Sequence, residues 1–160
     1  MKEIVFTGGN GCVGCQSIPL IEGVGYEVVR PRSSQVRLEV DEEVATLFSD
    51  GQHYDAIIHA AIVGGRRDVD DDWGVMHTNL NMFETLYKYI DHTDMFINLD
   101  SGASYGSNTP LPEQSTQYIG QVIPGNTYGF SILFSHMRVL HDHTVLQLHV
   151  STLFVDQRCY

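Results

Sequence analysis

Short apolar runs alternate with longer stretches of mixed polarity along the whole chain. The apolar runs are bounded by glycine, proline or polar residues, as β-strands are, and they cover residues 3–7, 26–29, 56–60, 95–99 and 145–154. Between them, apolar residues recur at helical spacing in residues 12–22, 41–48, 73–89 and 128–140. This alternation predicts an α/β fold, a doubly wound parallel sheet flanked by helices, formed by residues 1–160 as one domain.

A glycine-rich turn joins the first predicted strand to the first predicted helix. In the segment Thr7–Gly14 (TGGNGCVG), glycines lie at positions 8, 11 and 14. Such glycines allow a tight turn, a close approach of backbone to a diphosphate, and tight packing of helix on strand, while the helix N-terminus attracts the phosphates. A turn kept only for packing is the alternative. The pattern favours a Rossmann-type dinucleotide site formed by Gly8, Asn10, Gly11, Cys12, Val13 and Gly14.

Basic residues follow the second predicted strand. A carboxylate at this place would hold the ribose hydroxyls of NAD, whereas this chain has Arg30, Arg32 and Ser33. Guanidinium groups bind phosphate well, so we expect NADP(H) to be favoured, with NAD(H) as the alternative cofactor. Two arginines that form only a solvated surface pair would be the simpler explanation.

Composition narrows the choice of partners and compartment. The chain has 20 acidic and 9 basic residues and a formal net charge of -11, so it would repel a nucleic acid over most of its surface. Its apolar runs are far shorter than the roughly 20 residues of a membrane span. Three cysteines are too few for a disulfide framework. We therefore expect a cytoplasmic protein whose partners include neither nucleic acid nor a membrane, and no metal site.

Four further motifs follow the glycine turn in a consistent order: Asp55–Ala61 (DAIIHAA), His77–Leu80 (HTNL), Ser101–Gly106 (SGASYG) and Pro124–Gly129 (PGNTYG). With these motifs the sequence resembles the extended short-chain dehydrogenase/reductase family, also called NAD-dependent epimerases/dehydratases, over essentially all its length. Within that family, the segment Ala60–Gly65 (AAIVGG) and the arginines after the second strand are most similar to GDP-fucose synthases. Those enzymes are NADPH-dependent reductases and epimerases.

The resemblance implies a role for several residues. Tyr128 would be the catalytic acid or base, and the Ser101 hydroxyl would bind the same substrate oxygen. Further contacts to the cofactor are implied for His59, Ala60, Ala61 and Asn79. A hydrogen-bonded structural role is an alternative for the His59 side chain, because it lies in a predicted buried strand.

The chain departs from the family at a position that matters for catalysis. In the family, a lysine four residues after the tyrosine lowers the tyrosine pKa and holds the nicotinamide ribose; here that position is Ile132. A tyrosine with a pKa near 10 is ionised in only about one molecule in a thousand at neutral pH. In addition, Ala103 replaces a cysteine of GDP-fucose synthases, and the sequence ends before the sugar-binding lobe of the relatives.

These observations predict an NAD(P)-binding domain related to nucleotide-sugar epimerases and reductases, with catalysis impaired by Ile132. One alternative is an active nucleotide-sugar oxidoreductase or epimerase completed by a partner chain. The other is a non-enzymatic module that senses the dinucleotide. The family also pairs two helices across a dimer axis, which implies a homodimer through residues 73–90 and 128–140, with a monomer as the alternative.

Other groups of reactive side chains have simpler explanations. Cys12 and Cys15 form a C-x-x-C pair, for which packing of small residues is a simpler explanation than redox chemistry. His141, Asp142 and His143 are expected to form a polar turn, and the acidic segment 68–72 a solvated loop, since neither has the spacing of a metal site.

Overall fold

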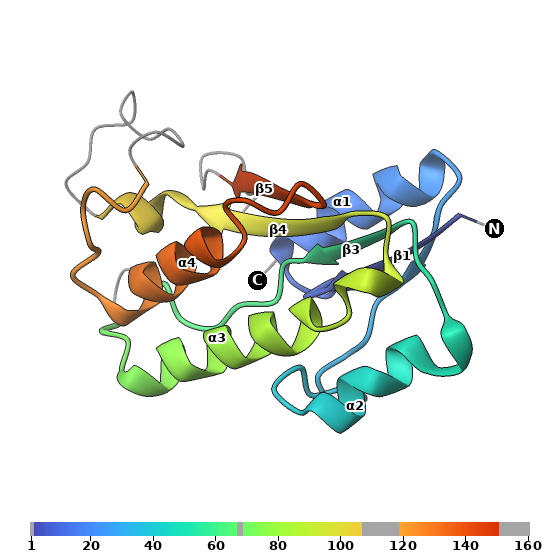
Figure 1. The fold of residues 1–160 in the computed structure, drawn as a ribbon, viewed down its shortest axis with the longest axis horizontal. Helices are drawn as coiled ribbons and strands as arrows, with labels where there is room; N and C mark the ends of the chain where they lie inside the picture. The colour runs from blue at the N-terminus through green and yellow to red at the C-terminus, as the bar shows by residue number, and fades with distance from the viewer. Residues whose placement is uncertain (1, 67–68, 107–118, 151–160) are drawn as a thin grey trace.

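Five parallel strands and the helices between them account for most of the computed structural model, which describes residues 2–66, 69–106 and 119–150 (Figure 1). The strands are β1 (Glu3–Thr7), β2 (Glu27–Val29), β3 (Ala56–His59), β4 (Phe96–Ser101) and β5 (Val145–Val150). The α-helices are α1 (Cys12–Gly23), α2 (Asp41–Ala45), α3 (Trp73–Tyr87) and α4 (Thr127–Arg138). Short 3-10 helices are η1 (Thr46–Gly51), η2 (Ile90–His92) and η3 (Gly102–Tyr105).

The strand order places a topological switch between β1 and β3. The sheet runs β2-β1-β3-β4-β5, and every pairing among these strands is parallel. From β1 the chain moves outward to β2, and from β3 it moves the other way through β4 to β5. Thr7 pairs with His59 at the carboxyl ends of the two central strands. In open α/β sheets, ligands bind at this kind of crevice.

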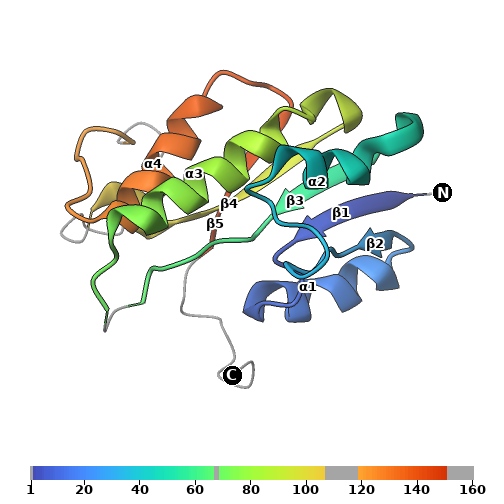
Figure 2. The ribbon, with the colours of Figure 1, turned by 90° about the horizontal axis from the view of Figure 1, so that it is seen from below.

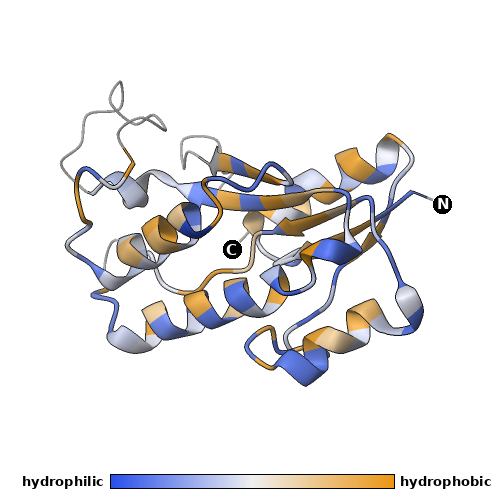
Figure 3. Ribbon diagram, viewed as in Figure 1, coloured by the Kyte–Doolittle hydropathy of each residue, from blue (hydrophilic) through white to orange (hydrophobic). Residues whose placement is uncertain are grey.

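Helices cover both faces of the sheet. Figure 2 shows α1 on one face and α2, α3 and α4 on the other. The larger apolar core lies on the α2–α4 side, where Val5, Ile57 and Phe96 of the strands meet Phe83 and other helix residues. A smaller core packs Ile18 of α1 against the opposite face. The helices are banded in apolar and polar residues (Figure 3), as expected for elements with one face on a sheet.

The fold class and the order of these elements are as predicted, and the differences lie at element ends. The predicted helix 41–48 is α-helical only to Ala45 and continues as η1, in which Phe48, Ser49 and Asp50 have non-helical backbone angles. The strand predicted at residues 95–99 extends to Ser101. The strand predicted at 145–154 is described to Val150, and its remainder lies outside the described residues. Residues 101–127, predicted as one polar loop, begin with η3, and residues 107–118 are also outside the described part.

Candidate functional site

The glycine turn lies directly against the carboxyl end of β3. Gly8 has a φ of +71°, and a Cβ placed on it would lie 2.7 Å from the Ala60 carbonyl carbon. A Cβ on Gly14 would lie 2.4 Å from the Gly9 Cα, so α1 packs on the turn with no room for a side chain. At Gly11 a Cβ would approach only the Gly8 carbonyl oxygen, at 3.1 Å. Of the three glycines, Gly8 and Gly14 are therefore required by packing, whereas at Gly11 a side chain would press on one backbone oxygen only.

The N-terminus of α1 is left available for an anion. Gly11 is the N-cap, no side chain caps the helix, and its first turn has no acidic residue. The helix dipole is positive at this end, which favours an anion. Cys15 is exposed and its thiol donates to the Asn10 carbonyl oxygen at 3.6 Å, so the packing role expected for this cysteine is wrong. Cys12 is half-buried.

A cavity of about 330 Å³ opens beside the glycine turn. Arg32 and Ser33 line it together with Gly8, Asn10 and Gly11, so the structure brings these predicted residues together. Arg30 is exposed and is not among the lining residues. The apolar part of the wall includes buried residues of the segment after β2 and of α3, namely Val36, Leu38 and Met82.

Glu39 also lines this cavity, and the sequence reasoning did not single it out. It is exposed and lies in the segment between β2 and α2, well beyond the strand end where an acidic residue was sought. Its carboxylate adds a hydrogen-bond acceptor to a cavity that also has the basic Arg32. The only sequence signal is its acidic character in the long connection to α2.

A second cavity, of about 180 Å³, extends from the same strand ends toward α3 and α4. Ala60, Ala61 and Ile62 line both cavities, so the two are adjacent along this backbone segment. The second cavity is also lined by Val13, His59, Asn79, Ser101 and Tyr128. The structure therefore gathers residues from all five predicted motifs around these two adjacent cavities, which together are called the groove below.

His59 is enclosed under this groove. Its Nδ1 lies 2.8 Å from the Thr7 hydroxyl, and its ring contacts Phe83 and Phe96. Complete burial lowers the pKa of His59 to about 4, so the ring is neutral at pH 7. The His59 side chain is thus hydrogen-bonded within the fold, which agrees with the structural alternative. The residue lines the second cavity because it lies at the carboxyl end of β3.

Asn79 of α3 fixes the chain that follows β3. Its Oδ1 accepts from the Val63 amide at 2.9 Å, and its Nδ2 donates to the Val63 carbonyl at 3.0 Å and to the Ser131 hydroxyl at 3.2 Å. One buried amide therefore ties together the loop after β3, α3 and α4. In this structure, Asn79 shapes the wall of the groove rather than offering it a free amide.

Tyr128 and Ser101 meet at the second cavity. Their side chains share a hydrogen bond, and the Ser101 Oγ also accepts from the Ala103 amide at 3.3 Å. Asn126 caps α4 by accepting from the Gly129 amide, which fixes the helix turn that carries Tyr128. Burial raises the pKa of Tyr128 above its usual value near 10, and the charges of Asp100 and Asp71 raise it further. The phenol is therefore neutral at physiological pH.

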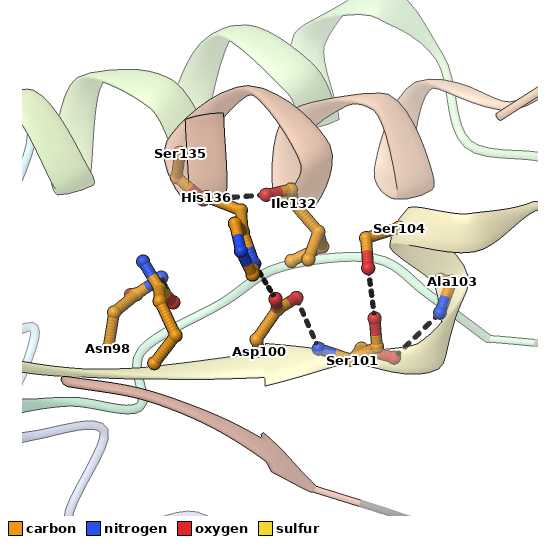
Figure 4. Close-up of polar contacts among 9 residues, drawn as sticks. Asn98, Asp100, Ser101, Ala103, Ser104, Ile132, Ser135 and His136 are labelled. Atoms are coloured by element: carbon orange, nitrogen blue, oxygen red, sulfur yellow. Dashed lines mark hydrogen bonds and ion pairs between the residues drawn. The ribbon is translucent and has the colours of Figure 1, made fainter. Parts of the chain in front are cut away.

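Ile132 lies at the position where the family resemblance implies a lysine. It is buried, lines the second cavity one helical turn after Tyr128, and points from α4 toward the end of β4 (Figure 4). Beside it, Asp100 Oδ2 lies 2.6 Å from His136 Nδ1, and Asp100 Oδ1 accepts from the Ser101 amide at 2.6 Å. The side chains of Asp100 and His136 are 0% and 1% exposed. The sequence reasoning did not find this buried pair.

The remaining candidate groups are used within the fold. Asp142 accepts from the Tyr87 hydroxyl and from Thr144, while His141 and His143 are exposed beside it. Asp71 accepts from the Gly65 amide at 2.9 Å, and Asp72 caps α3. Within residues 2–66, 69–106 and 119–150, no cluster of three or more metal-ligating side chains is found. None of the helices in this part of the chain is long and apolar enough for a membrane span.

Solved structures of nucleotide-sugar enzymes share this fold. A GDP-6-OMe-4-keto-L-xylo-heptose reductase from C. jejuni superposes with a TM-score of 0.80 at 14% identity, over 92% of this chain and 45% of that one. A GDP-L-fucose synthetase from Naegleria fowleri bound to NADP gives 0.71 at 19% identity, over 92% and 52%. The Bordetella bronchiseptica enzyme WbmG, in complex with NAD and UDP, gives 0.73 at 18% identity, over 91% and 52%.

The chain thus spans about half the length of these structures. A comparison with curated protein sequences finds no significant match. The model of the NAD dependent epimerase/dehydratase family matches residues 4–142, which include the glycine turn, the strand ends around the groove and the helix that carries Tyr128. The chain belongs to the NAD dependent epimerase/dehydratase family.

Proposed function

We propose that the chain binds a nicotinamide dinucleotide, NADP(H) or NAD(H), along the groove formed by the two adjacent cavities. The observation that carries the proposal is their shared border at Ala60–Ile62, which joins a cavity beside the glycine turn to one beside Tyr128. A dinucleotide has the matching form, with two nucleoside ends and a diphosphate between them. The groove lies at the switch between β1 and β3, where ligands of such sheets bind.

The residues present fit such a cofactor. Gly8 and Gly14 keep the turn tight, and the N-terminus of α1, which begins after Gly11 without a side-chain cap, would hold the diphosphate. The cavity lined by Val36 and Leu38 would take the adenosine end, and the one lined by Tyr128 the nicotinamide end. When bound, the nicotinamide would supply hydride chemistry, and Tyr128 and Ser101 would hold that end of the cofactor.

Catalysis in this chain is proposed to be impaired. A tyrosine that removes a proton from a sugar hydroxyl needs a lowered pKa, whereas burial and two carboxylates raise the pKa of Tyr128. Ile132 cannot oppose that effect, and Arg138 is engaged elsewhere, with Glu84 at 3.3 Å and over the Tyr87 ring. A neutral Tyr128 keeps the ability to donate a hydrogen bond to a substrate oxygen.

Two more specific functions, an active enzyme and a non-enzymatic module, make different predictions for turnover of the cofactor. An active oxidoreductase or epimerase for a nucleotide sugar would need a partner chain to complete the sugar site, and it would oxidise or reduce the cofactor when that sugar is added. A non-enzymatic module would bind the dinucleotide with no turnover. The raised pKa of Tyr128 favours the module over the enzyme.

Titration calorimetry with NADPH and NADH tests the proposal. We expect saturable binding of at least one of them, weakened about tenfold or more by Gly11→Val, whose side chain would lie at the helix N-terminus proposed for the diphosphate. Gly23→Ala is the matched control, because a Cβ there meets nothing within 4 Å and the position is at the far end of α1. Saturable binding by neither cofactor would refute the proposal.

The choice between NADP(H) and NAD(H) depends on opposed groups in one cavity. Arg32 favours a 2′-phosphate, while Glu39 favours free ribose hydroxyls. We propose that Arg32 dominates, so Arg32→Ala should lower the affinity for NADPH about tenfold and leave that for NADH nearly unchanged. Glu39→Gln should lower the affinity for NADH and leave that for NADPH nearly unchanged. Equal affinities of Arg32→Ala and the unaltered chain for NADPH would contradict the preference.

We also propose a homodimer and a cytoplasmic location. Phe134 and Met137 of α4 are 44% and 54% exposed, which is unusual for large apolar side chains on a helix that also contributes to the core. A second copy of the helix pair α3–α4 would cover them. The exposed thiol of Cys15 suits a reducing compartment.

A further inference from the structure

The second cavity contains a buried carboxylate and lacks a cationic side chain on its walls. Asp100 lines it, and none of its described lining residues is lysine or arginine. His59, which also lines it, is neutral at pH 7 because burial lowers its pKa to about 4. His136 binds Asp100 from α4 and is not itself a lining residue. The cavity is therefore lined by a carboxylate at Asp100 and by the apolar Ile132 at the position where the family resemblance implies a lysine.

The same electrostatic field acts on Tyr128. The charges of Asp100 and Asp71 raise the pKa of this tyrosine, which means that they destabilise a negative charge on its oxygen. By the same Coulomb interaction, they stabilise a positive charge placed next to it. Asp71 belongs to the loop that packs over the phenol, since a Cβ on Gly65 would lie 2.6 Å from the Tyr128 Cζ, and the Gly65 amide donates to Asp71.

We propose that this cavity selects the oxidised form of the nicotinamide cofactor, through the buried carboxylate of Asp100 and the apolar Ile132. The inference rests on the proposed function, because it concerns the nicotinamide end of that groove. The oxidised ring has a positive charge and the reduced ring has none, so only the former gains from the carboxylate. The chain would then respond to the oxidised fraction of the cofactor pool.

Calorimetry with both redox forms of each cofactor measures this selectivity. We expect the oxidised form to bind about tenfold more tightly than the reduced form, as for one charge several ångströms from a partly desolvated carboxylate. The net charge of -11 also disfavours the more anionic reduced form, but salt screens that long-range effect. The ratio of the two affinities should therefore persist at an ionic strength of about 0.5 M; equal affinities, or a ratio that vanishes with salt, would overturn the inference.

Ile132→Lys and Ile132→Met separate the local charge from the shape of the site. Lysine places an ammonium group beside Asp100, so the preference for the oxidised form should fall about tenfold; methionine has a similar size without charge and should keep it. Asp100→Asn, which removes the charge at constant shape, is the second variant in case lysine at this buried position prevents folding. An unchanged ratio in both charge-altering variants would overturn the inference.

ADP-ribose and its 2′-phosphate, which lack the nicotinamide, test the dinucleotide site without testing the redox preference. Their binding therefore shows whether this inference fails alone or together with the proposed function. Because the altered positions lie in the second cavity, these probes should bind all the variants equally. If a probe binds and the two redox forms bind equally, the selectivity is absent but the dinucleotide site stands. If neither probe nor any cofactor binds, the proposed function fails and the inference fails with it.

Discussion

Gly65 lies against the aromatic ring of Tyr128. A Cβ at position 65 would be 2.6 Å from the Tyr128 Cζ and 2.7 Å from its Cε2, and Gly65 has a φ of +77°. The loop after β3 can therefore cover the phenol only because this residue has no side chain. This contact explains why Tyr128 is half-buried although it lies at the border of a cavity.

Gly65→Ala should lower the free energy of unfolding by about 2–3 kcal/mol, since it combines a positive φ with a steric clash. Gly51→Ala is the matched control, because Gly51 has a φ of +74° and its Cβ would meet nothing within 4 Å. That control should lose only about 1 kcal/mol. Urea unfolding measures both, and equal losses would show that the Tyr128 contact has no energetic weight.

Asn79→Ala should destabilise the fold by about 2 kcal/mol or more, because it removes the side-chain partners of both the Val63 amide and the Val63 carbonyl. Asn81→Ala on the same helix is the control, since Asn81 makes an exposed contact with His77 and should change the stability by less than about 0.5 kcal/mol. Thermal unfolding followed by circular dichroism compares the two. Similar melting temperatures for the two variants would argue against the bridging role of Asn79.

The stability of the chain should fall as the pH drops through the range of His59. Its pKa is about 4 in the folded chain and near 6.5 when unfolded, so the unfolded state binds more protons between these values. The contribution is complete above pH 6.5 and is lost progressively toward pH 4, by about 3 kcal/mol in total. Urea unfolding of the unaltered chain and of His59→Gln between pH 4 and 8 isolates this effect. Parallel profiles for the two would rule it out.

Tyr128 should titrate above pH 10, and its ionisation should destabilise the fold, because the folded state prefers the neutral phenol. Its absorbance near 295 nm is obtained as the difference between the unaltered chain and Tyr128→Phe. In Ile132→Lys the nearby ammonium group should lower the Tyr128 pKa. If the tyrosine already ionised below pH 9 in the unaltered chain, the impaired catalysis proposed above would lose its basis.

Phe134→Glu should shift a homodimer toward the monomer, because it places a charge in the apolar surface proposed as the interface. Sedimentation velocity at several concentrations measures this shift. Leu20→Glu, on the exposed side of α1, is the control and should leave the association unchanged. A monomer at all concentrations of the unaltered chain would exclude the dimer.

Local sequence patterns were sufficient to predict the sheet, its helices and the glycine turn. The turn illustrates why: the need for glycine at positions 8 and 14 arises from contacts within a few residues and with the adjacent strand, which a motif records. The break after α2 was not predicted, because the apolar spacing continues through Leu47 and Phe48 while the backbone does not. Spacing alone does not report backbone angles.

Contacts between segments far apart in the sequence could not be predicted from local patterns. Asp100 and His136 are 36 residues apart, and each looks ordinary alone, as a polar residue at a strand end and a histidine in an amphipathic helix. Glu39 was missed because the search for a ribose-binding carboxylate stopped at the end of the second strand. The amide of Asn79 was assigned to the cofactor by resemblance, whereas its pairing with the Val63 backbone depends on the path of a loop.

The triple hydrogen bonding of Asn79 has a dynamic consequence. Since one side chain holds the loop after β3 to both α3 and α4, these segments cannot open independently. Amide hydrogens of Val63 and of the first turns of α4 should exchange with solvent in the same cooperative event. A small molecule bound at one end of the groove would then slow amide hydrogen exchange at the other end. The two ends would be coupled through the stability of these segments, without any shift of the backbone.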